Sequence, residues 1–214
     1  MDFHDLLTSG GLNTLTFTDP FAKILCTISA VRELGRTLYF DLDTMFSAYA
    51  NAGIIDIDGS RNLQADIFLP ARGRFMPVFG SAVEYLASKG PYSLVVFDSL
   101  NSFYNMYYDG AVSPVPQKRG TGRLNHFLCI VVMLLTKLGI ERRIPVLVTS
   151  MLRYRMDAGW VQSPASRRLI QQSSASRLNA ERFGERGFSV TVEKHPSIAA
   201  GERIIYEDVA LSLS

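Results

Sequence analysis

The stretch Ser93-Leu-Val-Val-Phe-Asp-Ser-Leu-Asn-Ser-Phe103 decides the fold class of this 214-residue chain. Its apolar run, Leu94 to Phe97, is typical of a strand buried on both faces of a parallel sheet. Asp98 ends the run, so its carboxylate is expected at the carboxyl end of a central strand, where open α/β sheets bind ligands. In a nucleotide-binding protein such an aspartate holds the water shell of Mg²⁺. The alternative is an aspartate that caps a helix beginning at Leu100.

Further buried-strand patterns alternate with helical ones along the chain. Alternating strands and helices predict an α/β fold with a mostly parallel central sheet flanked by helices. Two segments near the end alternate with period two and predict an antiparallel hairpin at one edge of the sheet. We expect one domain over residues 1–214, with flexible loops at about 109–122 and 157–176. The predicted strands are 15–17, 37–40, 93–97 and 145–149, the helices 21–34, 45–51, 79–89 and 123–141, and the hairpin 189–206.

The composition is that of a soluble globular protein, because 47% of the residues are hydrophobic and only 20% are charged. A formal net charge of +2 does not by itself indicate a polyanionic partner. Cys26 and Cys129 lie in apolar helical patterns and provide neither a disulfide framework nor metal-site spacing, which predicts a reducing compartment. The longest apolar stretch, Phe127 to Leu135, is too short to span a bilayer. We expect a cytoplasmic protein without membrane contact, nuclear or nucleoid-associated if it binds DNA.

Polar residues end two other predicted strands. Asp41 and Asp43 lie two residues apart, so their side chains are expected on the same side of an extended chain. One of them could orient a water for attack on a γ-phosphate, or both could belong to the start of the following helix. Thr149 ends a third strand, where a hydroxyl can sense a γ-phosphate. The arginines after it could contact an anion, or they could belong to a solvated basic loop.

Taken together, these segments resemble the RecA-like core of the RadA recombinases and their paralogs, from about Leu12 to the end of the chain. Leu38-Tyr-Phe-Asp-Leu-Asp43 looks like the family's strand that ends in its catalytic acid. Leu94-Val-Val-Phe-Asp-Ser-Leu100 looks like the Walker B strand. Ile144-Pro-Val-Leu-Val-Thr-Ser150 and the closing hairpin look like the later strands of the core. The resemblance implies a three-layer RecA-like fold.

The phosphate-binding loop of that family is missing. Its Walker A motif should fall at Thr18-Asp-Pro-Phe-Ala-Lys23, where the chain has no glycine. Pro20 lacks an N–H group, Phe21 adds bulk and Asp19 adds negative charge where phosphates would lie. Lys23 could be a remnant of the phosphate-binding lysine.

We therefore expect no ATP hydrolysis, no cofactor and no metal, with Lys23, Asp43 and Asp98 as vestigial site residues. Asp43 is one methylene shorter than the family's catalytic glutamate, which would misplace a general base. ATP–Mg²⁺ would bind only if the loop is divergent rather than lost.

The resemblance implies a non-catalytic recombinase paralog that acts as an accessory or scaffold in homologous recombination and DNA repair. Its expected partners are a RadA-type recombinase or other RecA-like paralogs, together with single-stranded DNA. From Met151 to Gly187 seven arginines face three acids, an excess that could neutralise phosphates or serve only as a solubilising surface. Tyr154 or Trp160 could stack on bases. The candidate nucleic-acid contacts are Lys118, Arg119, Arg153, Arg155, Arg167 and Arg168.

The sequence is also compatible with three other functions. An Elongator-type RecA-like subunit also lacks a phosphate loop and would build a ring that binds tRNA. A working ATPase with a divergent loop is the second alternative. The third is an unrelated α/β enzyme that uses Asp41, Asp43 and Asp98 around a metal.

Overall fold

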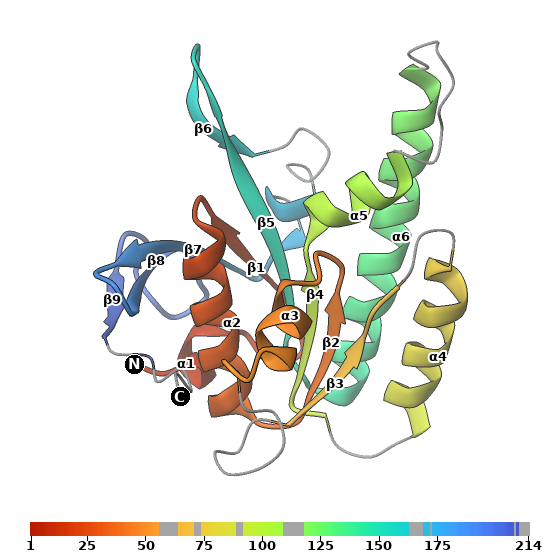
Figure 1. Cartoon of the computed structure of the whole chain (residues 1–214), viewed down its shortest axis with the longest axis horizontal. Helices are drawn as coiled ribbons and strands as arrows, with labels where there is room; N and C mark the ends of the chain where they lie inside the picture. The colour runs from red at the N-terminus through yellow and green to blue at the C-terminus, as the bar shows by residue number, and fades with distance from the viewer. Residues whose placement is uncertain are drawn as a thin grey trace.

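The computed structural model of the chain describes residues 1–55, 64–70, 74–88, 92–108, 118–162, 169–171, 173–207 and 209. In these parts of the chain the centre is a nine-stranded sheet in the order β3-β2-β4-β5-β1-β7-β8-β9, with β6 paired to β5 (Figure 1). The strands from β3 to β7 in that order are parallel, and β8 and β9 continue the sheet antiparallel. The predicted mostly parallel sheet with an antiparallel hairpin at one edge is confirmed.

The element bounds agree with most of the predicted segments. The strands are β1 (Leu12–Phe17), β2 (Thr37–Asp41), β3 (Ala65–Phe68), β4 (Leu94–Asp98), β5 (Val146–Arg155), β6 (Gly159–Gln162), β7 (Ser176–Phe183), β8 (Gly187–Lys194) and β9 (Arg203–Tyr206). The helices are α1 (Phe3–Leu6), α2 (Pro20–Leu34), α3 (Met45–Asn51), α4 (Phe75–Ser88), α5 (Leu100–Tyr108) and α6 (Lys118–Arg142). Strands β3, β6 and β7 were not predicted.

Helices cover both faces of the sheet, which makes three layers. Side chains along β4 alternate between two hydrophobic cores, as expected for a strand that is buried on both faces. Leu94 and Val96 belong to the core that includes α1 and α2. Val95 and Phe97 belong to the core that includes α4, α5 and α6.

Helix α2 begins and ends at clear local signals. Asp19 is its N-cap and Pro20, which has no N–H group to leave unpaired, occupies its first turn. Gly35 ends it with a φ of 91°, a conformation that glycine adopts without a Cβ clash. All residues from Ala22 to Val31 are buried, so the middle of the helix is enclosed on every side.

Helix α6 begins five residues before its predicted start at Arg123, so residues 118–122, predicted to belong to a loop, are helical. The rest of that loop, 109–117, lies outside the described residues. The segment Leu124–Arg142 is long and apolar enough to cross a membrane by those two measures, a test that a core helix also passes. Here Leu128, Val132 and Leu135 pack in the second core.

A projecting hairpin replaces part of the second predicted loop. Strand β5 continues past its predicted end at Thr149 to Arg155, turns, and pairs antiparallel with β6. We call residues 151–162 the arm; it extends beyond the sheet in Figure 1. Residues 159–162 and Ser176, predicted to be loop, are therefore strand residues.

Candidate functional site at the carboxyl edge of the sheet

The register of three parallel strands brings the predicted site residues to one edge. Asp41 of β2 is the register partner of Asp98 of β4, and the backbone N–H of Leu42 donates to the Asp98 carbonyl oxygen at 2.6 Å. Phe97 of β4 is paired with Val148 of β5, which places Thr149 beside Asp98. The ends of β2, β4 and β5 therefore meet at one edge of the sheet.

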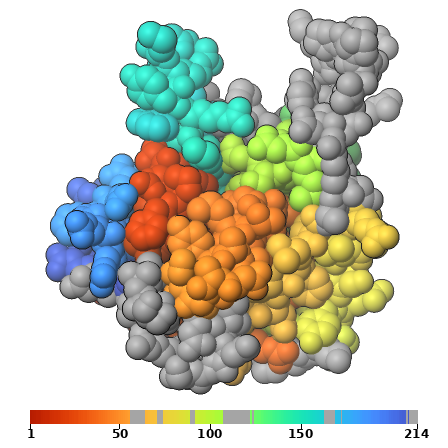
Figure 2. Space-filling model, viewed as in Figure 1, coloured from red at the N-terminus to blue at the C-terminus, as the bar shows by residue number. Residues whose placement is uncertain are grey.

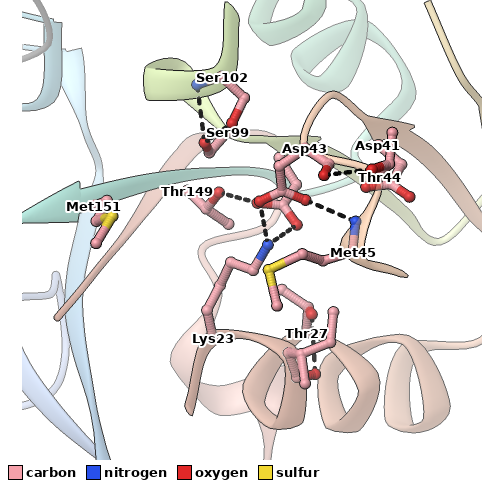
Figure 3. Close-up of polar contacts among 12 residues, drawn as sticks. Lys23, Thr27, Asp41, Asp43, Thr44, Met45, Ser99, Ser102, Thr149 and Met151 are labelled. Atoms are coloured by element: carbon pink, nitrogen blue, oxygen red, sulfur yellow. Dashed lines mark hydrogen bonds and ion pairs between the residues drawn. The ribbon is translucent and has the colours of Figure 1, made fainter. Parts of the chain in front are cut away.

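Lys23 points from α2 into this group of strand ends (Figure 3). Its Nζ lies 2.7 Å from Oδ2 of Asp43 and 2.7 Å from Oδ2 of Asp98. The side chains of Lys23 and Asp98 are fully buried, and that of Asp43 is 20% exposed. Burial opposes the charged ammonium, but attraction to Asp98 and Asp43 outweighs it and raises the pKa of Lys23. The lysine is therefore a charged, internal counter-ion.

Both carboxylate oxygens of Asp98 also accept hydrogen bonds from neighbouring hydroxyls. Thr149 Oγ1 donates to Oδ1 of Asp98 at 2.5 Å, and the Tyr39 hydroxyl donates to Oδ2 at 2.7 Å. Burial first, and then the nearby Asp98 charge, raise the pKa of Tyr39 well above its usual value. Asp98 does not cap α5, because Ser99 Oγ accepts the N–H of Ser102 at 3.2 Å. The sequence made Thr149 a candidate phosphate sensor, but in the structure its hydroxyl donates to a carboxylate.

Asp41 differs from its two neighbours in having an unsatisfied oxygen. Its Oδ2 accepts the N–H of Ser47 at 2.7 Å and the Ser47 hydroxyl at 2.5 Å. Its Oδ1 is buried and has no hydrogen-bond partner among the described residues. Burial raises the pKa of Asp41 to about 6, with the Ser47 bonds opposing and the charges of Asp98 and Asp43 adding to the rise.

Carboxylate oxygens of Asp41, Asp43 and Asp98 lie within 4.8 Å of one another, so these three residues are the candidate metal ligands. The ammonium of Lys23 already contacts two of them. A divalent cation and this ammonium would compete for the same oxygens, and like charges repel at such distances. Lys23, Asp43 and Asp98 form an ion-paired network, whereas Asp41 keeps a carboxylate oxygen without a partner among the described residues.

The first turn of α2 is closed by its own cap. Oδ1 of Asp19 accepts the N–H of Phe21 at 2.7 Å and that of Ala22 at 3.2 Å. Unpaired N–H groups at a helix N-terminus are what bind phosphate in nucleotide-binding proteins. In this chain a carboxylate of the protein occupies them.

The remaining predicted contact residues lie elsewhere. Arg153 and Arg155 lie on the arm, Lys118 and Arg119 belong to the first turn of α6, and Arg167 and Arg168 lie outside the described residues. Arg155 makes a two-pronged ion pair with Asp157, with N–O distances of 3.1 and 2.9 Å. Arg153 has no ion-pair partner in the part of the chain that the structure describes.

The arm also carries an aromatic pair that faces solvent. Tyr154 and Trp160 are register partners, with ring centroids 5.5 Å apart in an edge-to-face arrangement. Tyr154 is 64% exposed, Trp160 54% and Met156 at the turn 99%. Figure 2 shows the arm standing clear of the body of the molecule. Large exposed apolar side chains of this kind mark contact surfaces.

Lys23, Asp41, Asp43, Asp98 and Thr149 form what we call the buried centre, and several of its partners could not be found from the sequence. The cap at Asp19 had a local signal, since an aspartate followed by proline before a helical pattern is a common helix start. Tyr39 and Ser47 gave no signal, because their contacts with Asp98 and Asp41 depend on the packing of separate elements.

No protein-family model matches the sequence, and no curated protein matches it. Among solved structures, the crystal structure of the RadB recombinase is similar with a TM-score of 0.60 at 16% sequence identity. The match covers 93% of this chain and 87% of that one. At this identity the likeness establishes the fold, so the chain has the RecA-like fold of a recombinase. The predicted RecA-like fold is confirmed.

Proposed function

We propose that this chain is a non-catalytic recombinase paralog that acts as an accessory or scaffold protein in homologous recombination and DNA repair. One observation carries the proposal: Lys23, the counterpart of the phosphate-binding lysine by position, is buried and ion-paired with Asp43 and Asp98. A lysine held in this way supports the fold and is not available to a nucleotide.

ATP would have to break this network before it could bind. Withdrawing the ammonium would leave Asp98 buried without a counter-charge, which costs about 3–5 kcal/mol in comparable buried pairs. The phosphates would also approach Asp19, whose negative charge already satisfies the N–H groups of Phe21 and Ala22. Both effects favour an empty nucleotide position.

Partner binding is the role that such a fold can keep without catalysis. The likeness to a recombinase structure supports a RecA-like protein as the partner. The arm supports a second ligand, single-stranded DNA, because it exposes Tyr154 and Trp160 on one face and Arg153 on the other. Aromatic rings stack on bases of any sequence, and arginines neutralise the phosphates between them.

Isothermal titration with ATP–Mg²⁺ tests the central claim. We expect no binding tighter than about 10 µM, a free energy of roughly −7 kcal/mol. Thermal stabilisation by ATP–Mg²⁺ that Asp98→Ala abolishes would identify a divergent working ATPase and overturn the proposal. A Mg²⁺ requirement without nucleotide would instead support an enzyme built on the three aspartates.

Two binding assays test the partner and the nucleic acid. The tagged chain should retain a purified RadA-type recombinase, and it should bind a single-stranded oligonucleotide with an affinity that falls as salt rises. Tight, salt-sensitive binding of tRNA without binding of single-stranded DNA would overturn the recombination role and favour an Elongator-type subunit.

A further inference from the structure

A cavity of about 320 Å³ lies at the amino edge of the parallel strands, the edge opposite the arm (Figure 1). Its wall is built where the chain leads into strands: Ser9 precedes β1, Ser93 precedes β4 and Pro145 precedes β5. The buried centre lies at the other end of the same strands, because β4 runs from Leu94 to Asp98, about 15 Å of extended chain. The cavity is therefore separate from the candidate site at the carboxyl edge.

The lining of the cavity divides into an apolar floor and a polar mouth. Leu7, Tyr92 and Ile144 belong to the floor and are 4%, 4% and 8% exposed. Ser9 and Arg143 stand at the mouth and are exposed to solvent. The volume is at the lower end of the range for ligand pockets and matches a molecule of about ten heavy atoms. This division favours a small ligand with an apolar body and a polar head.

The charge at the mouth selects the kind of head group. None of the described residues that line the cavity is acidic, whereas His4 and Arg143 are basic. His4 is attracted to the carboxylate of Glu33, but Arg143 has no ion pair in the described part of the chain. A guanidinium binds the oxygens of a carboxylate or a phosphate through two parallel N–H bonds. Arg143 is therefore the group that an anionic head would meet.

The backbone at Arg143 also indicates a role for its side chain. Arg143 has a φ of 57°, in the left-handed region that glycine usually occupies after a helix. Its N–H donates to the carbonyl oxygen of Ile140 at 3.2 Å, so the helix end is closed by the backbone and needs no arginine side chain. A glycine would adopt this conformation without strain. Strained residues are frequent at ligand sites, where their side chains are needed in place.

Other contacts fix the walls of the cavity before a ligand binds. The Tyr92 hydroxyl donates to Oδ2 of Asp66 at 2.6 Å, and the guanidinium of Arg36 lies 5.0 Å from the centroid of the Tyr92 ring. The Ser9 hydroxyl donates to the carbonyl oxygen of Arg143 at 2.7 Å, which joins the mouth to the turn before β5. Because these side chains are already ordered, little conformational entropy is lost when a ligand binds.

We propose that this cavity binds a small organic anion, a carboxylate or a phosphate monoester of about ten heavy atoms in total. Its apolar body contacts Leu7, Tyr92 and Ile144, and its charged head pairs with Arg143. The proposal goes beyond the proposed function and depends on neither a recombinase nor DNA. Such a ligand should stabilise the folded chain in proportion to the logarithm of its concentration, because the unfolded chain has no such cavity.

Phenyl phosphate and benzoate are the probes, because each joins one ring to one of the two anionic heads. In amide proton–nitrogen correlation spectra of the full chain, they should shift the amides of lining residues with a Kd on the order of 100 µM. Saturable binding of either probe supports the site, and the tighter one identifies the head group. No saturation by either probe at about 10 mM would overturn the proposal.

Benzyl alcohol and inorganic phosphate each carry one part of the ligand and test whether both parts are needed. Each should bind at least about tenfold more weakly than phenyl phosphate, because one lacks the charge and the other the apolar body. If either binds as tightly as phenyl phosphate, the cavity does not recognise an organic anion. Shifts confined to the amides around Lys23 would place the anion at the other edge of the sheet and would likewise contradict the proposal.

Arg143→Gly separates recognition from folding. Glycine relieves the strained φ, so the midpoint of urea unfolding should stay the same or rise. The affinity for phenyl phosphate should fall at least about tenfold, since the charged partner of the head is gone. Arg186→Gly, at an exposed position in the turn between β7 and β8, is the matched control and should bind as the wild type does. Undiminished binding by Arg143→Gly would show that the site is not the one proposed.

Discussion

The buried centre and the arm arise at the same edge of the sheet but use their polar groups in opposite ways. In the centre, Lys23 is shielded from solvent and its ammonium is shared by two carboxylates. On the arm, Arg153 is exposed and has no ion partner among the described residues, and Tyr154 and Trp160 face solvent. In the centre, the charges of Lys23, Asp43 and Asp98 contact one another. The arm has groups left for a partner.

This difference separates two properties, stability and ligand recognition, that an α/β fold normally combines at one edge of its sheet. A buried ion pair contributes to folding only while both partners are present. An exposed arm contributes little to folding and can change its contacts freely. We infer that stability resides in the strand ends and recognition in the arm. The predictions below test this division, starting with the largest expected effect.

Replacing Lys23 with methionine should have the largest effect on stability. The change keeps the apolar stem but removes the positive charge that contacts both Asp98 and Asp43. Two carboxylates would remain without a counter-ion in a buried site, so we expect a loss of about 3–5 kcal/mol in the free energy of unfolding. Urea denaturation at pH 7 measures it.

Lys137→Met on α6 is the matched control, because Lys137 is 73% exposed and lies 3.9 Å from Glu141 in a surface ion pair. Its loss should cost at most about 0.5 kcal/mol. If Lys23→Met is no more destabilising than Lys137→Met, the centre is not the source of stability and the comparison fails.

Asp41→Asn should show that the ionised carboxylate of Asp41 lowers the stability of the folded chain. The pKa of Asp41 is raised to about 6, so the folded chain binds more protons than the unfolded chain between about pH 4 and 6. Stability contributed by this group therefore increases as pH falls through 6. Asparagine is neutral at every pH and keeps an acceptor for the two Ser47 donors. We expect the variant to be more stable than the wild type at pH 7, by up to about 3 kcal/mol.

The pH dependence distinguishes this cause from a change in packing. The difference between Asp41→Asn and the wild type should narrow by roughly 1 kcal/mol between pH 7 and pH 5, as the wild-type carboxyl takes up its proton. Urea titrations at both pH values measure it. A difference that does not vary with pH would show that Asp41 carries no such cost.

The fold could be predicted from the sequence wherever burial on both faces gave an uninterrupted apolar run. β2, β4 and the first half of β5 have this pattern, and they are the strands that position the centre. β7 alternates between buried and partly exposed residues and was missed within a polar segment. The end of β5 is exposed and polar, so only its pairing with β6 makes it a strand. Such pairing is a tertiary effect that local propensity does not contain.

The candidate site was predictable in its members but not in their contacts. Strand-end position identified Asp41, Asp98 and Thr149, since parallel strands bring their carboxyl ends together. The role of Lys23 was not predictable, because an internal ion pair and a vestigial phosphate ligand have the same sequence. The ion pair depends on how α2 packs over the strand ends, and no local sequence pattern encodes that packing.

Asp19→Ala should lower the free energy of unfolding moderately, because Asp19 acts on the buried centre only by capping α2, the helix that carries Lys23. The change removes the carboxylate that accepts the N–H groups of Phe21 and Ala22. Loss of a helix cap typically costs about 1 kcal/mol. Thr44→Ala is the matched control, since Thr44 occupies the N-cap of α3 but makes no side-chain cap bond. Equal effects in the two unfolding curves would mean that Asp19 does not act as a cap.

Asp157→Asn should have the smallest effect on stability and the most informative effect on binding. Asp157 and Arg155 form an exposed pair, with side chains 67% and 60% exposed, so the free energy of unfolding should change by at most about 0.5 kcal/mol. The change frees a second guanidinium on the arm beside Arg153. If the arm binds single-stranded DNA, affinity should increase and the plot of log K against log salt should steepen by up to about 0.7.

Arg153→Gln should do the reverse and flatten the same plot by about 0.7, because it removes a phosphate contact that is already available. Fluorescence anisotropy with a labelled oligonucleotide at several salt concentrations measures both slopes. Opposite shifts from two neighbouring positions cannot come from a general loss of folding. If Asp157→Asn and Arg153→Gln leave the slope unchanged, the arm does not contact the DNA backbone, and its exposed side chains serve protein contacts alone.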